Sequence, residues 1–235
     1  MRIQVLFGSQ SDERVYAPLC QSLENVGNVK MEVASAHRHP ERVREVVTTC
    51  EANAFVAGAG LAAHLPGVVA SLTKKPVFGV AINGAFGGMD AFLSIAQMPK
   101  DIPVAAVMEN QIEILPEILR KAKSFNPGKI EISWNPYRSE VPVLAKTLQD
   151  LREKAGMEIT WVDPNSPQCQ GEIVMVGEKP QGKNVSMYIC EKEELKNTDL
   201  ANEFFAVAKT GGAWVGVNNI VNFLLQIKKM KEALA

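Results

Sequence analysis

Two short clusters hold two of the chain's three histidines, and their residue types suit proton transfer on an anionic ligand. His37 and Arg38 lie in the sequence SAHR at residues 35–38, and His64 lies in the small-residue segment GLAAHLPG at residues 60–67. An imidazole can give or take a proton near neutral pH, and a guanidinium can hold a phosphate through two parallel N–H bonds. These clusters predict acid–base chemistry on a phosphorylated substrate.

A third segment, GSQSD at residues 8–12, predicts a phosphate-binding turn. It joins an apolar run to a helical pattern, so its backbone N–H groups and the helix dipole would favour an anion, and the small residues Ser9 and Ser11 would let a phosphate approach. Asp12 could accept hydrogen bonds from ribose hydroxyls, as carboxylates do in other strand–helix turns. An ordinary helix cap, made by Ser11 and Asp12, is the alternative.

The glycines and alanines of residues 60–67 predict a wall for a flat base, because small residues let a ligand approach the backbone. Backbone N–H groups at residues 60–63 could face a carboxylate or CO2, which His64 could polarise. A tight turn before a helix is the alternative here, and a solvent-exposed helix start is the alternative for residues 35–38. We expect His39 on the surface, because it has no comparable setting.

The sequence gives little support for a metal site, a serine hydrolase or a dinucleotide-binding motif. The three histidines have no aligned acidic partners of the kind that metal sites use, and no Gly-x-Ser-x-Gly motif of a serine hydrolase is present. The glycine-rich segment at residues 84–88 lacks dinucleotide-binding spacing and is interpreted as a flexible loop over the site. The cysteines are widely separated and are expected to be buried free thiols: Cys20, Cys50, Cys169 and Cys190.

The elements that must position these residues are five short apolar or β-branched runs separated by helical spacing. The runs are residues 3–7, 29–34, 54–57, 76–80 and 103–107. This alternation favours an α/β fold, a mainly parallel sheet with helices on both faces. Loops that leave the carboxyl ends of parallel strands gather at one edge, so residues 8–12, 35–38 and 58–67 should converge.

Composition and charge restrict the partners. A formal net charge of -1 gives no general attraction for nucleic acid or for an anionic membrane surface. No apolar run reaches the length of a membrane span, and the first apolar run is too short for a signal peptide. We therefore expect a cytoplasmic protein whose partner is a small molecule, with no nucleic acid and no membrane.

The sequence NPG at residues 126–128 is the best domain boundary, dividing the chain into residues 1–126 and 127–235. The second part echoes the first: residues 2–5 match 129–132, and 19–23 match 144–148. Six further positions match at one constant offset: Ala105, Val107, Asn110, Ile112, Lys121 and Lys123 with Ala213, Val215, Asn218, Ile220, Lys229 and Lys231. The sequence leaves two explanations open, a diverged duplication and convergent βα patterning.

If the second part is a copy, it keeps a scaffold without the chemistry. The sequence WNPYR at residues 134–138 replaces the small-residue turn, and no histidine follows His64. Strands at 174–176 and 185–189 and helices at 198–208 and 214–234 would complete it. We expect this smaller, degenerate α/β unit to serve packing.

Four segments together resemble the class I 5-(carboxyamino)imidazole ribonucleotide mutase family of purine biosynthesis. They are residues 8–12, 35–38, 62–67 (AAHLPG) and 90–99, which ends in LSIAQMP, in the family's order and approximate spacing. The resemblance covers residues 1 to about 123. It implies a flavodoxin-like three-layer fold, no cofactor, no metal, and an octamer with sites between subunits. A fused inactive copy standing in for a neighbour would instead give a homo-oligomer of four two-domain chains.

The resemblance also implies a reaction in which a carboxyl group leaves the exocyclic nitrogen of aminoimidazole ribonucleotide, is held as CO2, and is attacked by carbon 4. His37 would be the general acid and base, His64 would assist the carboxyl group, and Asp12 would hold the ribose. Ser11 and Arg38 would hold the phosphate. The expected substrate-binding set is Ser9, Ser11, Asp12, Ser35, Arg38, Gly60, Ala62, Ala63 and Leu65.

Three alternatives remain at this point. The AAHLPG segment favours a mutase over the related class that carboxylates aminoimidazole ribonucleotide directly with CO2. The family usually has threonine at the position of His39 and glycine or alanine at that of Leu61, and these departures keep another nucleotide substrate open. A non-catalytic nucleotide-binding or assembly subunit is the third, and the retention of His37 and His64 argues against it.

Overall fold

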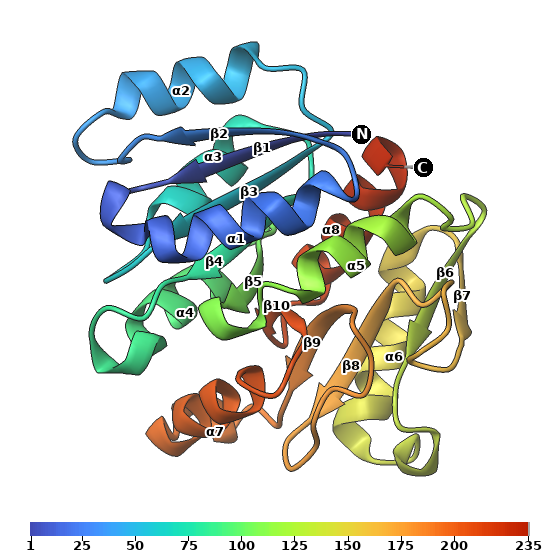
Figure 1. The fold of residues 1–235 in the computed structure, drawn as a ribbon. Helices are drawn as coiled ribbons and strands as arrows, with labels where there is room; N and C mark the ends of the chain where they lie inside the picture. The colour runs from blue at the N-terminus through green and yellow to red at the C-terminus, as the bar shows by residue number, and fades with distance from the viewer. Residues whose placement is uncertain (235) are drawn as a thin grey trace.

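The computed structural model describes residues 1–234 and contains one continuous ten-stranded sheet (Figure 1). The strand order is β2-β1-β3-β4-β5-β10-β9-β8-β6-β7. Every neighbouring pair runs parallel except β5 and β10, which run antiparallel. The strands are β1 (Arg2–Phe7), β2 (Asn28–Val33), β3 (Ala54–Ala59), β4 (Val77–Ala81), β5 (Ala105–Met108), β6 (Lys129–Ser133), β7 (Glu158–Trp161), β8 (Gly171–Met175), β9 (Val185–Ile189) and β10 (Ala213–Val217).

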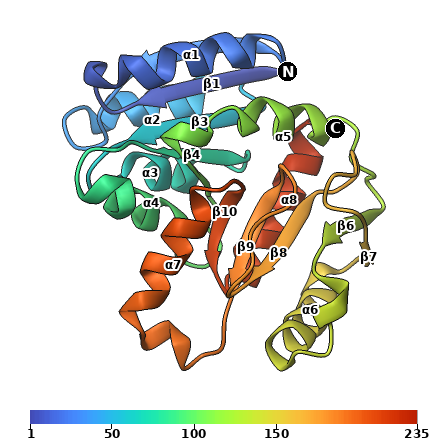
Figure 2. The ribbon, with the colours of Figure 1, turned by 60° about the horizontal axis from the view of Figure 1, so that its bottom comes forward.

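Helices cover both faces of this sheet (Figure 2). The α-helices are α1 (Glu13–Glu24), α2 (Pro40–Thr49), α3 (Leu65–Leu72), α4 (Met89–Ala96), α5 (Ile114–Ala122), α6 (Pro142–Ala155), α7 (Thr198–Ala208) and α8 (Ile220–Leu234). Short 3₁₀ turns are η1 (Gln10–Asp12), η2 (Phe86–Gly88), η3 (Glu109–Gln111), η4 (Pro136–Arg138) and η5 (Glu194–Lys196). No helix among residues 1–234 has both the length and the apolar character that a membrane span requires.

The core consists of two hydrophobic layers, one on each face of the sheet. Side chains of α1, α5, α6 and α8, such as Leu19 and Phe223, pack on one face. Side chains of α2, α3, α4 and α7, such as Phe92 and Phe204, pack on the other. The structure therefore has the three layers expected of a doubly wound α/β protein.

The first half has the strand order of a flavodoxin-like sheet, β2-β1-β3-β4-β5. This order confirms the fold class predicted for the first half. The carboxyl ends of β1, β3 and β4 lie at the same edge because these strands are parallel neighbours. The loops that follow them therefore converge there.

The second half repeats this strand order, as β7-β6-β8-β9-β10. Loops at residues 162–170 and 176–184 stand where the first half has α2 and α3. Because β5 and β10 pair antiparallel, the two halves present the carboxyl ends of their strands in opposite directions. Such an arrangement is what a pseudo-two-fold relation between two like units would produce.

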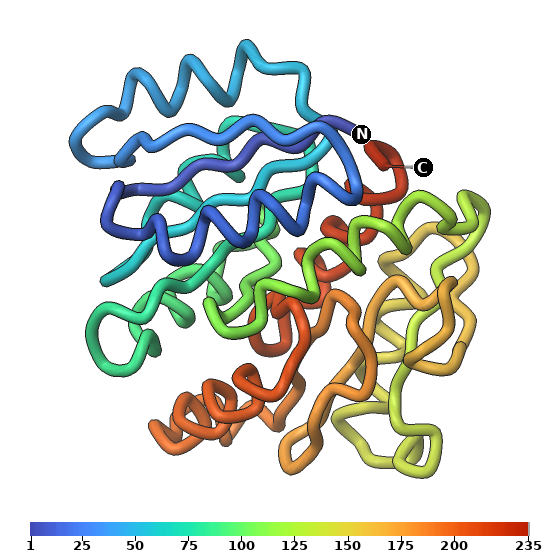
Figure 3. Tube along the Cα trace, viewed as in Figure 1, coloured from blue at the N-terminus to red at the C-terminus, as the bar shows by residue number. Residues whose placement is uncertain are grey.

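The two halves are tied together by backbone and side-chain hydrogen bonds. Trp214 of β10 pairs with Ala106 of β5. The Asn222 side chain in α8 donates to the Pro99 carbonyl at 2.8 Å. The Asn53 side chain donates to the Ala233 carbonyl at 3.1 Å and accepts from the Arg2 backbone N–H at 2.8 Å, so the two chain ends lie near each other (Figure 3). A boundary at residue 126 in sequence therefore corresponds to no break in the sheet.

Most predicted elements are present with ends shifted by a few residues, but one prediction was wrong. The helix expected over residues 214–234 is a strand, β10, followed by α8. Gly216 and Asn218 have φ angles of 73° and 53°, which end the extended segment and prevent a continuous helix through it. The short edge strand β7 was not predicted.

Candidate active site

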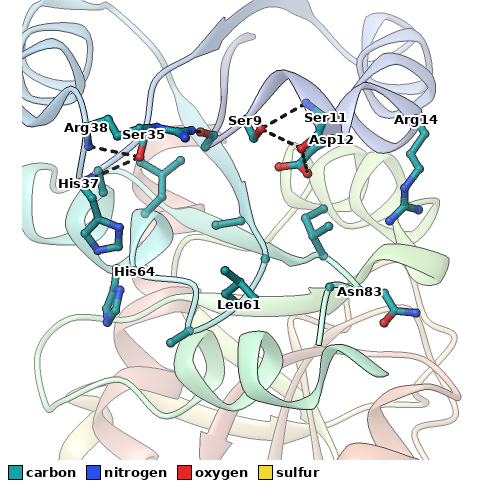
Figure 4. Close-up of a pocket in the computed structure, with 18 residues that line it drawn as sticks. Ser9, Ser11, Asp12, Arg14, Ser35, His37, Arg38, Leu61, His64 and Asn83 are labelled. Atoms are coloured by element: carbon teal, nitrogen blue, oxygen red, sulfur yellow. Dashed lines mark hydrogen bonds between the residues drawn. The ribbon is translucent and has the colours of Figure 1, made fainter. Parts of the chain in front are cut away.

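The loops at the carboxyl edge of the first half enclose a cavity of about 680 Å³ (Figure 4). Its lining comes only from residues 8–84, so within one chain the second half does not form part of the wall. The lining residues are Gly8, Ser9, Ser11, Asp12, Arg14, Ser35, Ala36, His37, Arg38, Ala59, Gly60, Leu61, Ala62, His64, Leu65, Ile82, Asn83 and Gly84. The three loops predicted to converge do so.

All but one of the predicted site residues line this cavity. The exception is Ala63, whose side chain is 2% exposed and packs in the hydrophobic layer beneath the loop. Its neighbours Ala62 and His64 are exposed on the cavity side. Sequence alone could not resolve this alternation, because the loop has no regular period. His39 is exposed and lies outside the cavity lining, as expected.

The turn after β1 is organised by Ser9. Its hydroxyl accepts hydrogen bonds from the Ser11 backbone N–H at 3.2 Å and from the Ser11 hydroxyl at 2.8 Å. The alternative of an ordinary helix cap is not supported at Asp12, which occupies the N-cap position of α1 but whose side chain forms no cap hydrogen bond. The Asp12 carboxylate is therefore left facing the cavity, at the positive end of a twelve-residue helix.

The loop after β2 holds His37 and Arg38 in fixed positions. The buried Ser35 hydroxyl accepts from the backbone N–H groups of both residues at 3.4 Å each. Arg38 Nη2 donates to the Gly8 carbonyl at 3.0 Å, which joins this loop to the turn after β1. A guanidinium has five N–H donors, so others remain for an anion.

The two histidines contact each other across the cavity wall. The ring centroids of His37 and His64 lie 4.9 Å apart at 76°, an edge-to-face arrangement. Figure 4 shows this pair on one side of the cavity, Ser9 and Ser11 along the upper wall, and Arg14 on the far side. Both imidazoles are exposed to the cavity. The two imidazoles therefore lie on one side of the cavity, apart from the serine hydroxyls of the upper wall.

The far wall contains a network that the sequence did not reveal. Arg14 of α1 donates to both carboxylate oxygens of Glu109 at 3.0 Å, and Glu109 also accepts from the Asn83 backbone N–H at 2.9 Å. Glu109 therefore ties the start of α1 to the loop after β4. The pair joins residues 95 positions apart, and no local spacing signals such a contact. Asn83 could have been found, because it follows the carboxyl end of β4.

Burial raises the pKa of the Asp12 carboxyl above its usual range. The Ser11 hydroxyl and the Arg14 guanidinium oppose this shift, but desolvation is the largest effect. A carboxylate that is partly removed from water loses hydration, and hydrogen bonds from other donors offset that loss. Ligand hydroxyls in the cavity would supply them.

Two large side chains, one in each of the loops that follow β3 and β4, have left-handed backbone conformations. Leu61 has a φ of 52° and Phe86 a φ of 48°. Bulky residues rarely adopt this region, and such strain is typical of binding loops. Both side chains are exposed, Leu61 by 65% and Phe86 by 83%. Leu61, which lines the cavity, thus exposes an apolar side chain beside it.

No group of three or more histidine, cysteine or acidic side chains in the described part of the chain, residues 1–234, could hold a metal ion. The four cysteines are free, as predicted, but the burial predicted for all four holds only for Cys169 and Cys190; Cys20 and Cys50 are partly exposed.

Comparisons with known proteins place these loops in a family. A family model described as AIR carboxylase matches residues 2–113. The N5-carboxyaminoimidazole ribonucleotide mutase of Methanocaldococcus jannaschii is 50% identical over 106 residues, covering 45% of this chain and 68% of that protein. The Thermotoga maritima protein of the same name is 39% identical over 141 residues, covering 53% of this chain and 82% of that protein.

A protein with a different name is also similar. The phosphoribosylaminoimidazole carboxylase of Saccharomyces cerevisiae is 39% identical over 165 residues, covering 66% of this chain and 29% of that protein. The family model spans the residues that line the cavity. This chain therefore belongs to the AIR carboxylase family, which includes the N5-carboxyaminoimidazole ribonucleotide mutases.

Proposed function

We propose that this protein is a purine-biosynthetic mutase that moves the carboxyl group of N5-carboxyaminoimidazole ribonucleotide from the exocyclic nitrogen to carbon 4. The mutase names of relatives at 39–50% identity support the reaction. The observation that carries the proposal is the contact between His37 and His64 in a cavity that also presents Arg38 and two serine hydroxyls. An imidazole ribonucleotide needs imidazoles for proton transfer on its ring, and it needs a guanidinium and hydroxyls to bind its phosphate.

The rearrangement requires one proton transfer to the exocyclic nitrogen and one proton transfer from carbon 4. When the nitrogen–carboxyl bond breaks, the nitrogen takes up a proton and CO2 is released into the cavity. When carbon 4 attacks CO2, a carbon–carbon bond forms and carbon 4 must lose its proton. Because the net proton change is zero, one imidazole can perform both transfers. We assign this role to His37, and we assign the orientation of the carboxyl group to His64.

The remaining residues would hold the nucleotide. Ser11, Arg38 and the N-terminus of α1 would bind the phosphate, and Asp12 would accept the ribose hydroxyls. Ser9 and the backbone of residues 60–65 would contact the base and the carboxylate. The small side chains Gly60 and Ala62 leave room for a flat ring on this wall.

Replacing His37 by asparagine tests this assignment. His37→Asn should lower kcat by about 100- to 10,000-fold, the usual contribution of a general acid or base, while the dissociation constant for aminoimidazole ribonucleotide stays within a few-fold. Calorimetric titration measures the second quantity. His39→Asn is the matched control, because His39 is exposed outside the cavity and should have wild-type turnover. Loss of binding without loss of turnover per bound substrate would refute the role of His37.

Direct carboxylation is the second candidate, favoured by the similarity to the yeast carboxylase. The two reactions differ in the substrate that supplies the carboxyl group. A mutase converts N5-carboxyaminoimidazole ribonucleotide at limiting CO2, whereas a direct carboxylase needs aminoimidazole ribonucleotide and added bicarbonate. Initial rates with each substrate separate them. If the protein converts neither of these two substrates nor any pyridine nucleotide, it is a non-catalytic nucleotide-binding or assembly subunit.

We also infer that the protein works as a homo-oligomer in the cytoplasm. The cavity opens beside Leu61, and the exposed apolar side chains of Leu61 and Phe86 would be covered by a neighbouring copy. A tetramer of two-domain chains would have four times the 25.6 kDa mass of one chain. Light scattering on the purified protein tests this, and a stable monomer contradicts it.

A further inference from the structure

The second half contains a cavity at the place that corresponds to the site of the first half. It has a volume of about 690 Å³ and lies at the carboxyl ends of β6 and β8, whereas the first cavity, of about 680 Å³, lies at those of β1 and β3. The turns at the two sites are built alike. The Asn135 side chain accepts from the Tyr137 backbone N–H at 3.1 Å, as Ser9 accepts from that of Ser11.

The lining of this second cavity is aromatic where the first is small. Trp134, Tyr137 and Trp161 line it; Tyr137 is 97% exposed and Trp161 is 44% exposed. The Trp161 ring N–H donates to the Trp134 carbonyl at 3.0 Å, and the Trp134 ring N–H donates to the Ser139 hydroxyl at 3.3 Å. Both indole donors are therefore occupied, and what the rings offer a ligand is their flat surface.

The charged side chains that line this cavity are three acids, Asp163, Glu172 and Glu178, and one base, Lys179. Glu178 accepts from the Asn135 side chain at 2.9 Å and from Arg138 at 3.2 Å. Glu172 accepts from the backbone N–H groups of Gln181 and Gly182 at 2.8 and 3.1 Å. Arg138 pairs with Glu178 outside the lining, so no arginine lines this cavity as Arg38 lines the first. The negative charge of Glu178 would repel a phosphate, and the cavity has no counterpart of Arg38, which is proposed to bind the phosphate in the first cavity.

The two exposed charges of this lining are of opposite sign. Asp163 and Lys179 line the cavity and are exposed, so neither favours an anion strongly. No histidine follows His64 in the sequence, so the cavity lacks an imidazole for proton transfer. Its groups suit binding without the acid–base chemistry proposed for the first cavity.

We propose that this second cavity binds the flat heteroaromatic base of a nucleoside that carries no phosphate, by stacking on Tyr137 and Trp161. Ligands of open α/β sheets bind outside the carboxyl ends of the strands, and aromatic faces bind bases of any sequence through stacking. The cavity volume is that of a small-molecule site. This inference does not depend on the reaction proposed for the first cavity.

Tryptophan fluorescence of the full chain tests the proposal, because the three tryptophans divide cleanly between the cavity and the core. Trp134 and Trp161 line the cavity, and Trp214 is fully buried. No tryptophan lines the first cavity, so binding there has no direct reporter. Titration with adenosine, guanosine and inosine should quench the emission saturably. If none of the three does so at about 1 mM, the proposal is wrong.

Variants locate the binding. Tyr137→Ala should weaken nucleoside binding by roughly 5- to 150-fold, the range of a lost base–aromatic stack, and its 97% exposure means that folding should be unaffected. Leu195→Ala is the matched control, since Leu195 is another exposed large apolar side chain, 49% exposed, outside the cavity. Unchanged affinity in both Tyr137→Ala and Trp161→Leu would overturn the proposal.

A phosphate comparison tests the ligand class. Adenosine 5′-monophosphate should bind no more tightly than adenosine, because acidic side chains outnumber basic ones in the lining. A monophosphate that binds tenfold more tightly than the nucleoside would overturn the assignment. The His37→Asn variant should give the wild-type fluorescence titration, so a failure of this proposal and a failure of the proposed reaction are distinguished.

Discussion

At the residue scale, the site depends on a few side chains whose surroundings assign them different tasks. The Ser35 hydroxyl fixes the backbone at His37 and Arg38, and Arg38 is in turn anchored to the Gly8 carbonyl. The imidazole of His37 therefore meets His64 in a defined geometry. A general acid and base must be held within hydrogen-bond reach of its substrate atom, so this support is as important as the imidazole itself.

Asp12 gives a prediction with a definite sign. Its pKa is raised in the folded protein, mainly by burial, so between the unfolded and folded pKa values the folded state binds more protons than the unfolded state. Stability is then lost as the pH rises through this window, and at neutral pH the ionised carboxylate is a net cost. Asp12→Asn should therefore raise Tm at pH 7.

The pH dependence of this gain identifies its cause. Below the unfolded pKa both states carry a protonated Asp12, so the Tm difference between wild type and Asp12→Asn should shrink in acid. The same variant should have a higher KM, because a neutral amide is a weaker acceptor for ribose hydroxyls. Calorimetry over a pH series measures the first effect. A Tm advantage that is constant with pH would show that the buried charge is not responsible.

At the element scale, the loop after β4 is held by Glu109, which lies far from it in the sequence and also forms an ion pair with Arg14. Glu109 accepts from Arg14 and from the Asn83 backbone, and its side chain is 16% exposed. Glu109→Ala removes both interactions, whereas Glu109→Gln keeps an acceptor for Asn83. Amide exchange over residues 83–88 should therefore rise by up to about 10-fold in Glu109→Ala and much less in Glu109→Gln. Equal exchange in the two variants would contradict this account.

A second element-scale prediction concerns α8. The Asn222 side chain is fully buried and donates to the Pro99 carbonyl, so it holds the loop before β5. Asn222→Ala removes this hydrogen bond and leaves space at a fully buried position, so the unfolding free energy should fall by about 0.5–3 kcal/mol. Urea denaturation measures the loss. Glu232→Gln, an exposed change in the same helix, should be neutral, and a neutral Asn222→Ala would refute the role of this contact.

The sequence predicted the elements whose residues signal them locally. Runs such as residues 185–189 gave a strand with the observed bounds. Trp214 was placed in a helix because its strand is short and leads directly into α8. The strand β7 was missed because it is a short edge strand with exposed ends.

The site was predictable where it follows strand ends and unpredictable where it depends on distant contacts. His37 and His64 follow β2 and β3, and parallel strands bring such loops together. Arg14 and Glu109 meet only because β5 ends beside α1, which no spacing reveals. The inward side chain of Ala63 depends on the loop's course, since irregular segments carry no period that separates the two sides.

At the scale of the whole molecule, we propose that the second half is a diverged copy of the first. The matching strand orders, the similar turns at Ser9 and Asn135, and two cavities of nearly equal size support a duplication. Convergent βα patterning accounts for the order of strands but not for the paired turns. Loss of the helices that correspond to α2 and α3 would explain why the second half is smaller.

One continuous sheet should unfold as one unit. All three tryptophans lie in the second half, whereas far-ultraviolet circular dichroism reports both halves. Because β5 pairs with β10 and the central helices share one hydrophobic layer, the two signals should give the same urea midpoint. Separate midpoints would show that residues 1–126 and 127–235 fold as independent domains.

The most direct test of the central claim is a crystal structure of the protein with aminoimidazole ribonucleotide bound. The account predicts the phosphate at Ser11 and Arg38, the ribose at Asp12, and carbon 4 within about 3.5 Å of a ring nitrogen of His37. His64 should face the place of the carboxyl group. A ligand in this cavity with carbon 4 beyond reach of both imidazoles, or a ligand bound only in the second half, would contradict it.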